Sequence, residues 1–232
     1  MIFILTGAGI SRESGIDTFR DKGGLWEKVK VEDVATPQGF RRDPKRVYEF
    51  YDLRRRELAS GNVLPNPAHL ALARLAKGEK IFLATQNVDD LHERAGSARV
   101  VHMHGELLKA LCSLCGESCP WPGDLGAEDV CPYCGKAGGL RPDVVWFGEM
   151  PYHMEEIEEA CSRADLFVSI GTSGAVHPAA GLVRIAKGCG AVTLEINLER
   201  SLNADFFDHG RYGPASRTVP EWVDDVLSPR KP

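Results

Sequence analysis

Four cysteines occur as two closely spaced pairs in the middle of the chain. Cys112 and Cys115 form one C-x-x-C pair, Cys131 and Cys134 form the other, and fifteen residues separate the pairs. This spacing is typical of a tetrahedral zinc site with four thiolate ligands, which leaves no open position for water. We therefore predict one structural zinc ion. Cys119 lies between the pairs without a paired neighbour and is an alternative ligand.

A short glycine-containing segment follows the apolar run at the N-terminus. Gly7 and Gly9 lie just after residues 2–5, and such a loop lets main-chain amides approach a diphosphate closely. The third glycine of the dehydrogenase pattern G-x-G-x-x-G is replaced by Arg12. The loop therefore predicts a dinucleotide ligand without predicting hydride transfer.

Two histidines, His102 and His104, follow a short apolar run. Imidazole is the side chain best suited to acid–base chemistry near neutral pH. His104 precedes Gly105 at the expected end of a strand, where a base can reach a ligand. We therefore predict that His104 is the base, with His102 as the alternative, because a histidine within the strand is more often packed and satisfied.

Short β-rich runs alternate with helical patterns along most of the chain. This alternation predicts an α/β fold, with a mostly parallel sheet and helices on both faces. Two segments interrupt the rhythm, residues of about 21–65 and the cysteine-rich residues 105–142. The expected strands cover residues 2–5, 80–85, 100–102, 143–147, 166–170 and 191–196, and the expected helices cover 44–58, 68–75, 155–164 and 179–187.

Each of the six expected strands is followed by a short segment of small or polar residues. Ligand sites in such sheets lie beyond the carboxyl ends of the strands, so we expect the six segments to share one crevice rather than only to form turns. They are residues 7–11, 86–89, 104–105, 148–149, 171–173 and 197–199.

The composition excludes several classes of protein. The 232 residues are 43% hydrophobic and carry 28 basic and 33 acidic side chains, a net charge of −5, which is ordinary for a globular chain and gives no basic footprint for nucleic acid. No apolar run approaches the roughly 20 residues of a membrane-spanning helix, and no export signal is visible. We therefore expect a cytoplasmic protein with reduced thiols. The oligomeric state is left open, and a monomer is plausible.

Taken together, the motifs resemble those of a known family. They are G-A-G-I-S at residues 7–11, Phe19–Arg20, T-Q-N-V-D-x-L-H at 85–92, His104–Gly105, the two cysteine pairs, residues 147–149, residues 171–173 and Asn197. In this order they resemble the sirtuins, which are NAD-dependent protein lysine deacylases, over residues 2 to about 215. The resemblance implies a single catalytic domain. A Rossmann-like, doubly wound large part would cover about 1–20, 66–104 and 143–232, and a small part would combine a helical module (about 21–65) with a zinc ribbon (about 105–142).

The resemblance also implies the site residues and the reaction. NAD and an acyl-lysine protein or peptide would react to give nicotinamide, free lysine and O-acyl-ADP-ribose. The catalytic residues would be His104, as base, and Asn87, which with Asp89 would hold the ribose and the nicotinamide amide. The substrate backbone would pair with Val145, Phe147, Gly148 and Glu149. The NAD-binding residues implied are Gly7, Ala8, Gly9, Ile10, Ser11, Phe19, Arg20, Trp26, Gln86, Asn87, Val88, Asp89, Gly171, Thr172, Ser173, Asn197, Leu198, Glu199 and Ala215.

One arginine has a predicted place on an amphipathic helix. Asp43 and Pro44 are a helix start signal, and the spacing of Tyr51 and Arg54 puts both on the apolar face, whereas Arg55 and its neighbour at 56 turn to other faces. A guanidinium on that face needs an anionic partner. The alternative is that residues 54–56 are a solvated basic run.

The pair of Tyr51 and Arg54 also resembles the bacterial and mitochondrial sirtuin subgroup that removes succinyl and malonyl groups. The resemblance implies that the arginine binds the acyl carboxylate in a fork, that the tyrosine hydroxyl adds a bond, and that Ala35 leaves room beside them. We therefore expect desuccinylation with retained deacetylation. The alternatives are mono-ADP-ribosyl transfer, an oxidoreductase or a zinc-ribbon nucleic-acid binder, and the missing third glycine and the acidic pI disfavour the last two.

Overall fold

The structure is a computed structural model that describes residues 1–16 and 29–228. Within these residues, six strands form one sheet in the order β3-β2-β1-β7-β8-β9, with every neighbouring pair parallel. Its strands are β1 (Ile2–Thr6), β2 (Ile81–Thr85), β3 (Val101–His102), β7 (Leu166–Ile170), β8 (Val192–Asn197) and β9 (His209–Tyr212). The strand order reverses on either side of β1, so the sheet has its switch point between β1 and β7.

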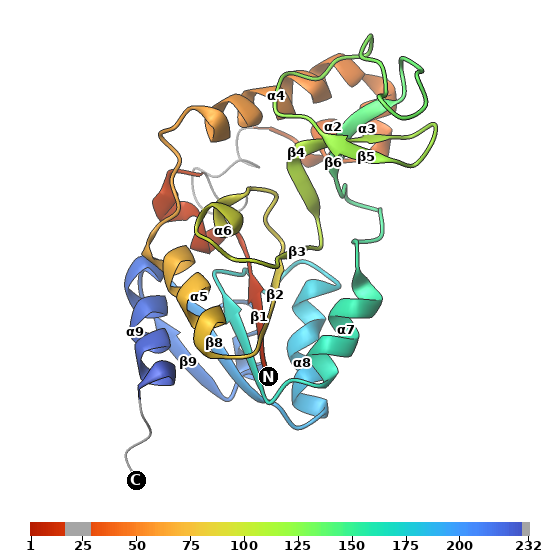
Figure 1. Ribbon diagram of the computed structural model, residues 1–232. Coiled ribbons are helices and arrows are strands. Elements are labelled where there is room, and N and C mark those ends of the chain that lie inside the picture. Colours follow the sequence, from red (N-terminus) through yellow and green to blue (C-terminus); the bar gives the residue numbers. More distant parts are fainter. Residues whose placement is uncertain (17–28, 229–232) are drawn as a thin grey trace.

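Helices cover both faces of the six-stranded sheet, as Figure 1 shows. Helices α5 (Pro67–Gly78) and α9 (Ala215–Leu227) pack on one face, and α7 (Met154–Ser162) and α8 (Leu182–Gly188) pack on the other. Strand β1 is buried along its whole length because Ile2 and Ile4 point into the first core while Phe3 and Leu5 point into the second. The doubly wound α/β fold predicted from the sequence is confirmed.

A second, antiparallel sheet occupies the cysteine-rich part of the chain. In the described residues it has the order β5-β4-β6 and consists of β4 (Gly105–Cys112), β5 (Ser118–Pro120) and β6 (Leu140–Val144). The strand expected at 143–147 is therefore placed wrongly, because it ends at Val144 and pairs with β4 instead of joining the parallel sheet. An apolar run predicts a strand but does not predict which sheet the strand joins.

Three helices pack against this second sheet: α2 (Val31–Val34), α3 (Pro37–Arg42) and α4 (Pro44–Ala59). The predicted start of α4 is confirmed, since the Asp43 carboxylate accepts a hydrogen bond from the Arg46 amide at 3.0 Å. One core joins α2 and α4 to the strands through Val34, Val47 and Leu107, among others. We call helices α2–α4 and the three-stranded sheet the smaller unit, and it lies at the top of Figure 1, beyond one end of the six-stranded sheet.

One of the three consecutive arginines of α4 does not lie where the sequence predicted. Arg55, not Arg54, is the fully buried one: it forms an ion pair with Asp52, and its Nε donates to the Leu107 carbonyl at 2.8 Å. Asp52 also accepts a hydrogen bond from the Leu125 amide at 3.0 Å. Helix α4 is thus covered on two sides, and its second covered side carries the charged pair that ties it to β4 and to the cysteine-rich segment.

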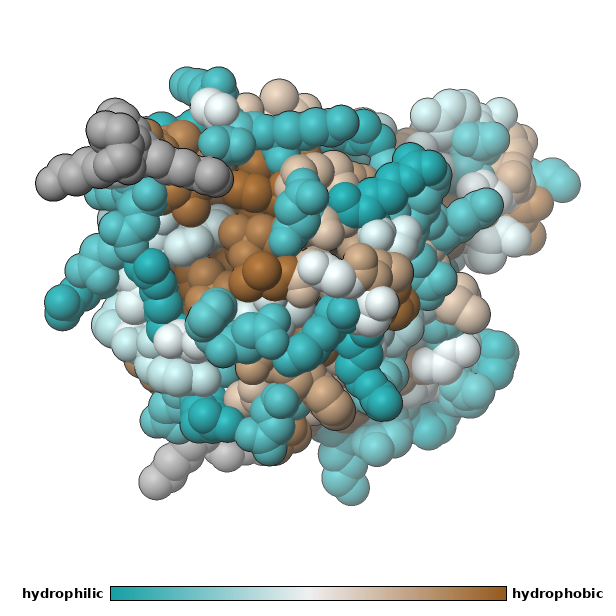
Figure 2. Space-filling model, turned by 90° about the horizontal axis from the view of Figure 1, so that it is seen from below, coloured by the Kyte–Doolittle hydropathy of each residue, from teal (hydrophilic) through white to brown (hydrophobic). Residues whose placement is uncertain are grey.

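The outer surface is mainly polar on the face shown in Figure 2, where hydrophilic residues surround a smaller group of apolar ones. None of the helices in the described ranges is both long enough and apolar enough to cross a membrane.

Candidate active site

One large cavity lies at the carboxyl ends of the parallel strands and extends to the smaller unit. Its volume is about 920 Å³, and all six polar segments singled out in the sequence contribute to its lining, which confirms that they share one crevice. The predicted site residues that line it are Gly7, Ala8, Gly9, Tyr51, Arg54, Gln86, Asn87, Val88, His104, Val145, Phe147, Gly148, Glu149, Gly171, Thr172, Ser173, Asn197, Leu198, Glu199 and Ala215. Phe19, Arg20 and Trp26 lie outside the described residues.

The floor at one end of the cavity is built from main chain. The Gly9 amide donates to the Gly171 carbonyl at 2.9 Å, so the loops after β1 and β7 touch each other. A Cβ added to Gly9 would lie 2.7 Å from the Gly171 Cα, and one added to Gly7 would lie 2.8 Å from the Gly171 carbonyl oxygen. Only glycine permits this approach, and the shallow cradle that results fits a diphosphate.

A buried polar group lies behind the wall next to this floor. Asn87 Nδ2 donates to Ser11 Oγ at 3.1 Å, and Ser11 Oγ donates to Asp89 Oδ2 at 3.0 Å. Burial raises the pKa of Asp89 to about 6. Ile10, Ser11 and Asp89 are buried and do not line the cavity, so the two polar ones hold Asn87 in place from behind.

His104 lies in the cavity wall with one ring nitrogen fixed. Its Nδ1 is 3.0 Å from the Gln86 carbonyl, and because a carbonyl only accepts, Nδ1 carries the hydrogen. A neutral His104 ring therefore has its lone pair on Nε2. Burial lowers the pKa of His104, which favours this neutral form at neutral pH. The residue has the tautomer and the protonation state of a general base.

His102, the alternative, is engaged at both ring nitrogens. Nδ1 lies 3.1 Å from the Asn87 carbonyl and Nε2 lies 2.8 Å from Glu93 Oε1. Although burial lowers the pKa of His102, its hydrogen bond to Glu93 and the Glu93 charge raise it overall. The structure thus brings His104 into the cavity and leaves His102 as a packed, satisfied histidine.

The opposite end of the cavity is built from side chains of α4 and the loop after β6. Tyr51, Arg54 and Phe50 line it together with Ala35. The Arg54 guanidinium lies 3.4 Å from the Phe50 ring centroid, and its Nη1 donates to the Phe50 carbonyl at 2.6 Å. A guanidinium fork beside a tyrosine hydroxyl is a suitable arrangement for binding a carboxylate.

The four predicted zinc ligands come together in the smaller unit. Their Sγ atoms all lie within 4.8 Å of one another, and the pairs Cys112–Cys134 and Cys115–Cys131 are each 3.8 Å apart. Tetrahedral coordination with Zn–S bonds of about 2.3 Å requires S···S distances of about 3.8 Å, so the four thiols fit a zinc ion. Cys119 is buried with its Sγ 3.6 Å from the Ala110 carbonyl, and it does not belong to this group.

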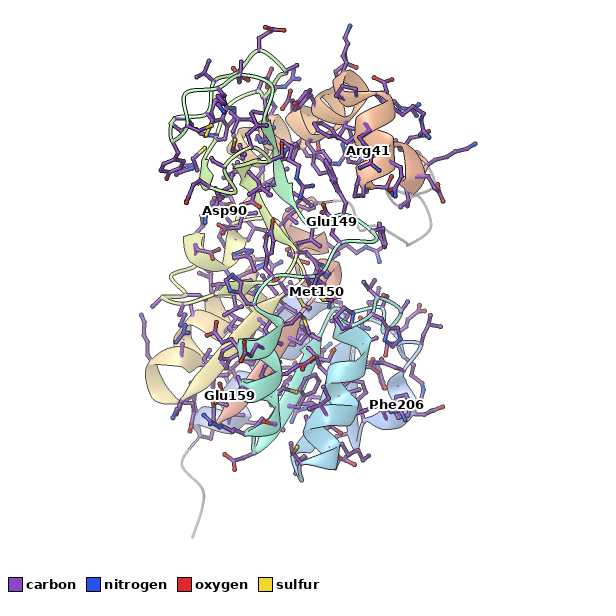
Figure 3. All side chains as sticks on the ribbon, turned by 90° about the vertical axis from the view of Figure 1, so that its right-hand side faces the viewer. Arg41, Asp90, Glu149, Met150, Glu159 and Phe206 are labelled. Carbon is purple, nitrogen blue, oxygen red and sulfur yellow. The ribbon has the colours of Figure 1, made fainter. Side chains whose placement is uncertain are left out.

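Other residues of the cavity were not predicted. Arg12 and Glu13 continue the wall after the glycine loop. Arg12 could have been predicted, because a basic residue stands there in place of the third glycine of the dinucleotide-binding pattern. Trp146 lies within the predicted peptide-binding stretch but was passed over. Glu149 accepts a hydrogen bond from the Trp146 amide at 2.8 Å, and its Oε1 lies 3.0 Å from Arg141 Nη2 in an ion pair. Figure 3 shows Glu149 between the smaller unit and the six-stranded sheet.

Comparison with known sequences gives one consistent family. The model of the Sir2 family matches residues 7–178. The chain is 57% identical over 228 residues to the NAD-dependent protein deacylase of Escherichia coli (strain K12), covering 97% of this chain and 82% of the relative. It is 55% identical over 232 residues to the protein of the same name from Caulobacter vibrioides, covering 98% of this chain and 97% of the relative.

Comparison with solved structures agrees. A complex of a Sir2 homologue with NAD has a TM-score of 0.86 and 39% identity, with 98% of this chain and 90% of that one covered. A structure of Sir2 bound to acetylated peptide has a TM-score of 0.81 and 27% identity, with 98% and 94% covered.

Proposed function

The chain belongs to the Sir2 family, and on that premise we propose that it is an NAD-dependent protein lysine deacylase that removes acetyl and also succinyl or malonyl groups. The single observation that carries the proposal is that one cavity is lined by the glycine floor, by His104 and by Arg54. The groups that would cradle the cofactor, act as base and bind a carboxylate thus line one continuous surface.

The residues of the cavity suit this chemistry. NAD supplies the nicotinamide leaving group and the ribose that receives the acyl group. The glycine floor and the loop of Thr172 would hold the diphosphate, and Asn197 fixes that loop by donating to the Thr172 carbonyl at 2.7 Å. Nε2 of His104 would accept a proton inside the cavity, where Asn87 is held rigid by Ser11.

The peptide and the metal would bind to the smaller unit and its border. Val145, Phe147, Gly148 and Glu149 line the cavity where the chain leaves β6 and turns, since the Glu149 amide donates to the Trp146 carbonyl at 2.9 Å, and a peptide backbone would bind along this stretch. One zinc ion held by Cys112, Cys115, Cys131 and Cys134 would be structural, because four thiolates close its coordination shell. We further propose the single-domain organisation described above and a cytoplasmic location, in which these thiols stay reduced.

The acyl preference rests on the two side chains at the far end of the cavity. A succinyl or malonyl group ends in a carboxylate, whereas an acetyl group ends in a methyl. Arg54 offers a charged, planar fork to the first and nothing specific to the second. Ala35 adds only a methyl group to the wall at this end, which leaves room for the longer acyl chain.

A panel of acylated peptides with NAD, read by mass spectrometry, tests the proposal. We expect NAD-dependent removal of both acetyl and succinyl groups, with release of nicotinamide. Arg54→Met should lose most of the succinyl activity and keep acetyl activity, because only the charged acyl group needs the fork. Arg56→Met is a matched control, since Arg56 is an exposed arginine that pairs with Asp124.

Two results would contradict the acyl assignment. Equal loss of both activities in Arg54→Met would mean that Arg54 is structural. A wild-type protein that removes acetyl but not succinyl or malonyl groups would leave deacylation standing and refute the preference. An ADP-ribosylated peptide as the main product would instead favour mono-ADP-ribosyl transfer.

A further inference from the structure

The hydroxyl group of Tyr51 has a hydrogen-bond partner in Trp146. Trp146 Nε1 donates a hydrogen bond to Tyr51 Oη at 3.0 Å, and both side chains are buried, with 3% and 5% of their surface exposed. An indole N–H is only a donor, so it occupies a lone pair of the tyrosine oxygen. The hydrogen of the Tyr51 hydroxyl must therefore point away from the indole nitrogen.

The indole is itself held in place by three contacts. The Trp146 amide donates to Glu149 Oε2 at 2.8 Å, the Arg141 guanidinium lies 4.2 Å from the indole ring, and the Phe40 ring centroid lies 5.1 Å away. Arg141 and Glu149 also form an ion pair with each other, at 3.0 Å. The direction of Nε1 is thus set by the smaller unit before any ligand enters the cavity, which lowers the entropic cost of using the hydroxyl.

We propose that Trp146 is a positioning residue for acyl specificity: by occupying the acceptor side of Tyr51 it makes the Tyr51 hydroxyl a hydrogen-bond donor to the acyl carboxylate. This inference rests on the proposed function, in which Tyr51 and Arg54 bind that carboxylate. A carboxylate is an acceptor only, and an acetyl methyl offers neither a donor nor an acceptor. The arrangement therefore favours acyl groups that end in an anion.

The environment of Tyr51 supports this assignment. Burial raises the pKa of Tyr51 to about 12, even though the hydrogen bond from Trp146 lowers it. The hydroxyl therefore keeps its hydrogen throughout the neutral range. Arg54 and Tyr51 line the same cavity, so the proposal brings a carboxylate held by the guanidinium to the hydroxyl hydrogen that the indole leaves available.

A double-mutant cycle tests the inference with the full chain, saturating NAD and one peptide carrying either succinyl-lysine or acetyl-lysine. We expect Trp146→Phe, which keeps an aromatic ring but lacks the N–H, to lower the succinyl-to-acetyl ratio of kcat/KM about 3- to 10-fold, mainly through KM, as loss of one hydrogen bond does. Tyr51→Phe should lower the ratio similarly. The double variant should match Tyr51→Phe, because Trp146 acts through that hydroxyl.

Trp121→Phe is the matched control. It also removes an indole donor, in this case one that binds the Asp124 carbonyl at 2.8 Å in the cysteine-rich segment, so it should leave the ratio unchanged. If Trp146→Phe does not fold, Tyr51→Phe alone tests the donor assignment, and an unchanged ratio there overturns it.

Failure of the inference can be told apart from failure of the proposed function. If wild type removes succinyl groups and Arg54→Met does not, but Trp146→Phe keeps the wild-type ratio, only the inference is overturned. The same holds if the effects of Trp146→Phe and Tyr51→Phe add, since Trp146 would then act independently of the hydroxyl. A wild type without succinyl or malonyl activity overturns the acyl assignment and this inference together.

Discussion

The two ends of the cavity are built from different materials. At the end next to the six-stranded sheet, the floor is main chain, where Gly9 and Gly171 meet across the switch point. At the other end, the wall consists of side chains, with Tyr51 and Arg54 on α4 and Trp146 beside them. A main-chain floor is fixed by the register of the sheet, whereas side chains can be exchanged singly. The difference suggests that cofactor use and acyl preference can change independently of each other.

His104 lies where the two ends meet. It follows β3 of the six-stranded sheet, and the next residue, Gly105, begins β4 of the smaller unit. Gly105 has a φ of +79°, and a Cβ there would lie 2.1 Å from the Asp143 carbonyl oxygen, so the chain can pass between the two sheets at this point only with glycine. If His104 is the base, we expect it to serve the reaction whichever acyl group is bound.

Replacement of His104 should give the largest effect and the same effect on both substrates. We expect His104→Ala to lower kcat about 10²- to 10⁴-fold with acetyl and succinyl peptides alike, because it removes the positioned base. NAD affinity and the midpoint of thermal unfolding should change little. His209→Ala, at an exposed histidine on β9, is the control. Near-normal turnover of His104→Ala would refute its assignment as base.

The main-chain end was the more predictable one. The glycine loop follows β1 directly in the sequence, and the segments at 86–89, 171–173 and 197–199 each follow or end a strand of the parallel sheet. Because parallel strands all end at the same edge, local patterns were sufficient to bring these segments together. His104 could be preferred over His102 for the same reason.

The side-chain end depends on contacts that no local pattern shows. The burial of Arg55 follows from its partners Asp52 and Leu107, the second of which lies 52 residues away. The bond between Tyr51 and Trp146 spans 95 residues. Periodicity placed Tyr51 and Arg54 correctly on one side of α4, but it could not show that the helix has a second buried side. Strand β6 was misassigned for a similar reason, since its pairing with β4 is tertiary.

Loss of the metal should affect the side-chain end first. The expected zinc segment reaches α4 through the Leu125 amide, which donates to Asp52, the partner of buried Arg55. We expect Cys131→Ser to lose the metal, to lower the thermal unfolding midpoint and to reduce activity less than His104→Ala, because the base and the glycine floor lie outside the metal site. Metal content by atomic emission and calorimetric unfolding measure this.

Cys119→Ser is the control for the metal site, because Cys119 lies outside the group of four thiols. It should keep one metal ion for each chain. Loss of metal in Cys119→Ser together with full metal content in Cys131→Ser would show that the ligand set is wrong. Absence of bound metal in the wild-type protein would remove the structural reason for the cysteine pairs.

A substitution at the main-chain end tests most directly whether the two ends of the cavity are independent. In Gly9→Ala the new Cβ meets only main-chain atoms of Gly171, the nearest at 2.7 Å, so the loops after β1 and β7 must move apart. Such overpacking costs about 1–3 kcal/mol, and we expect this cost to appear in NAD binding because the displaced main chain forms the diphosphate cradle, which would raise the KM for NAD about 5- to 150-fold. Gly181→Ala is the matched control, because a Cβ there meets nothing within 4 Å.

Since the side-chain end, with Tyr51 and Arg54, is built from other elements, the succinyl-to-acetyl ratio of kcat/KM should stay at its wild-type value in Gly9→Ala. A changed ratio would mean that the glycine floor and the side-chain end are coupled through residues 145–149 and cannot change independently.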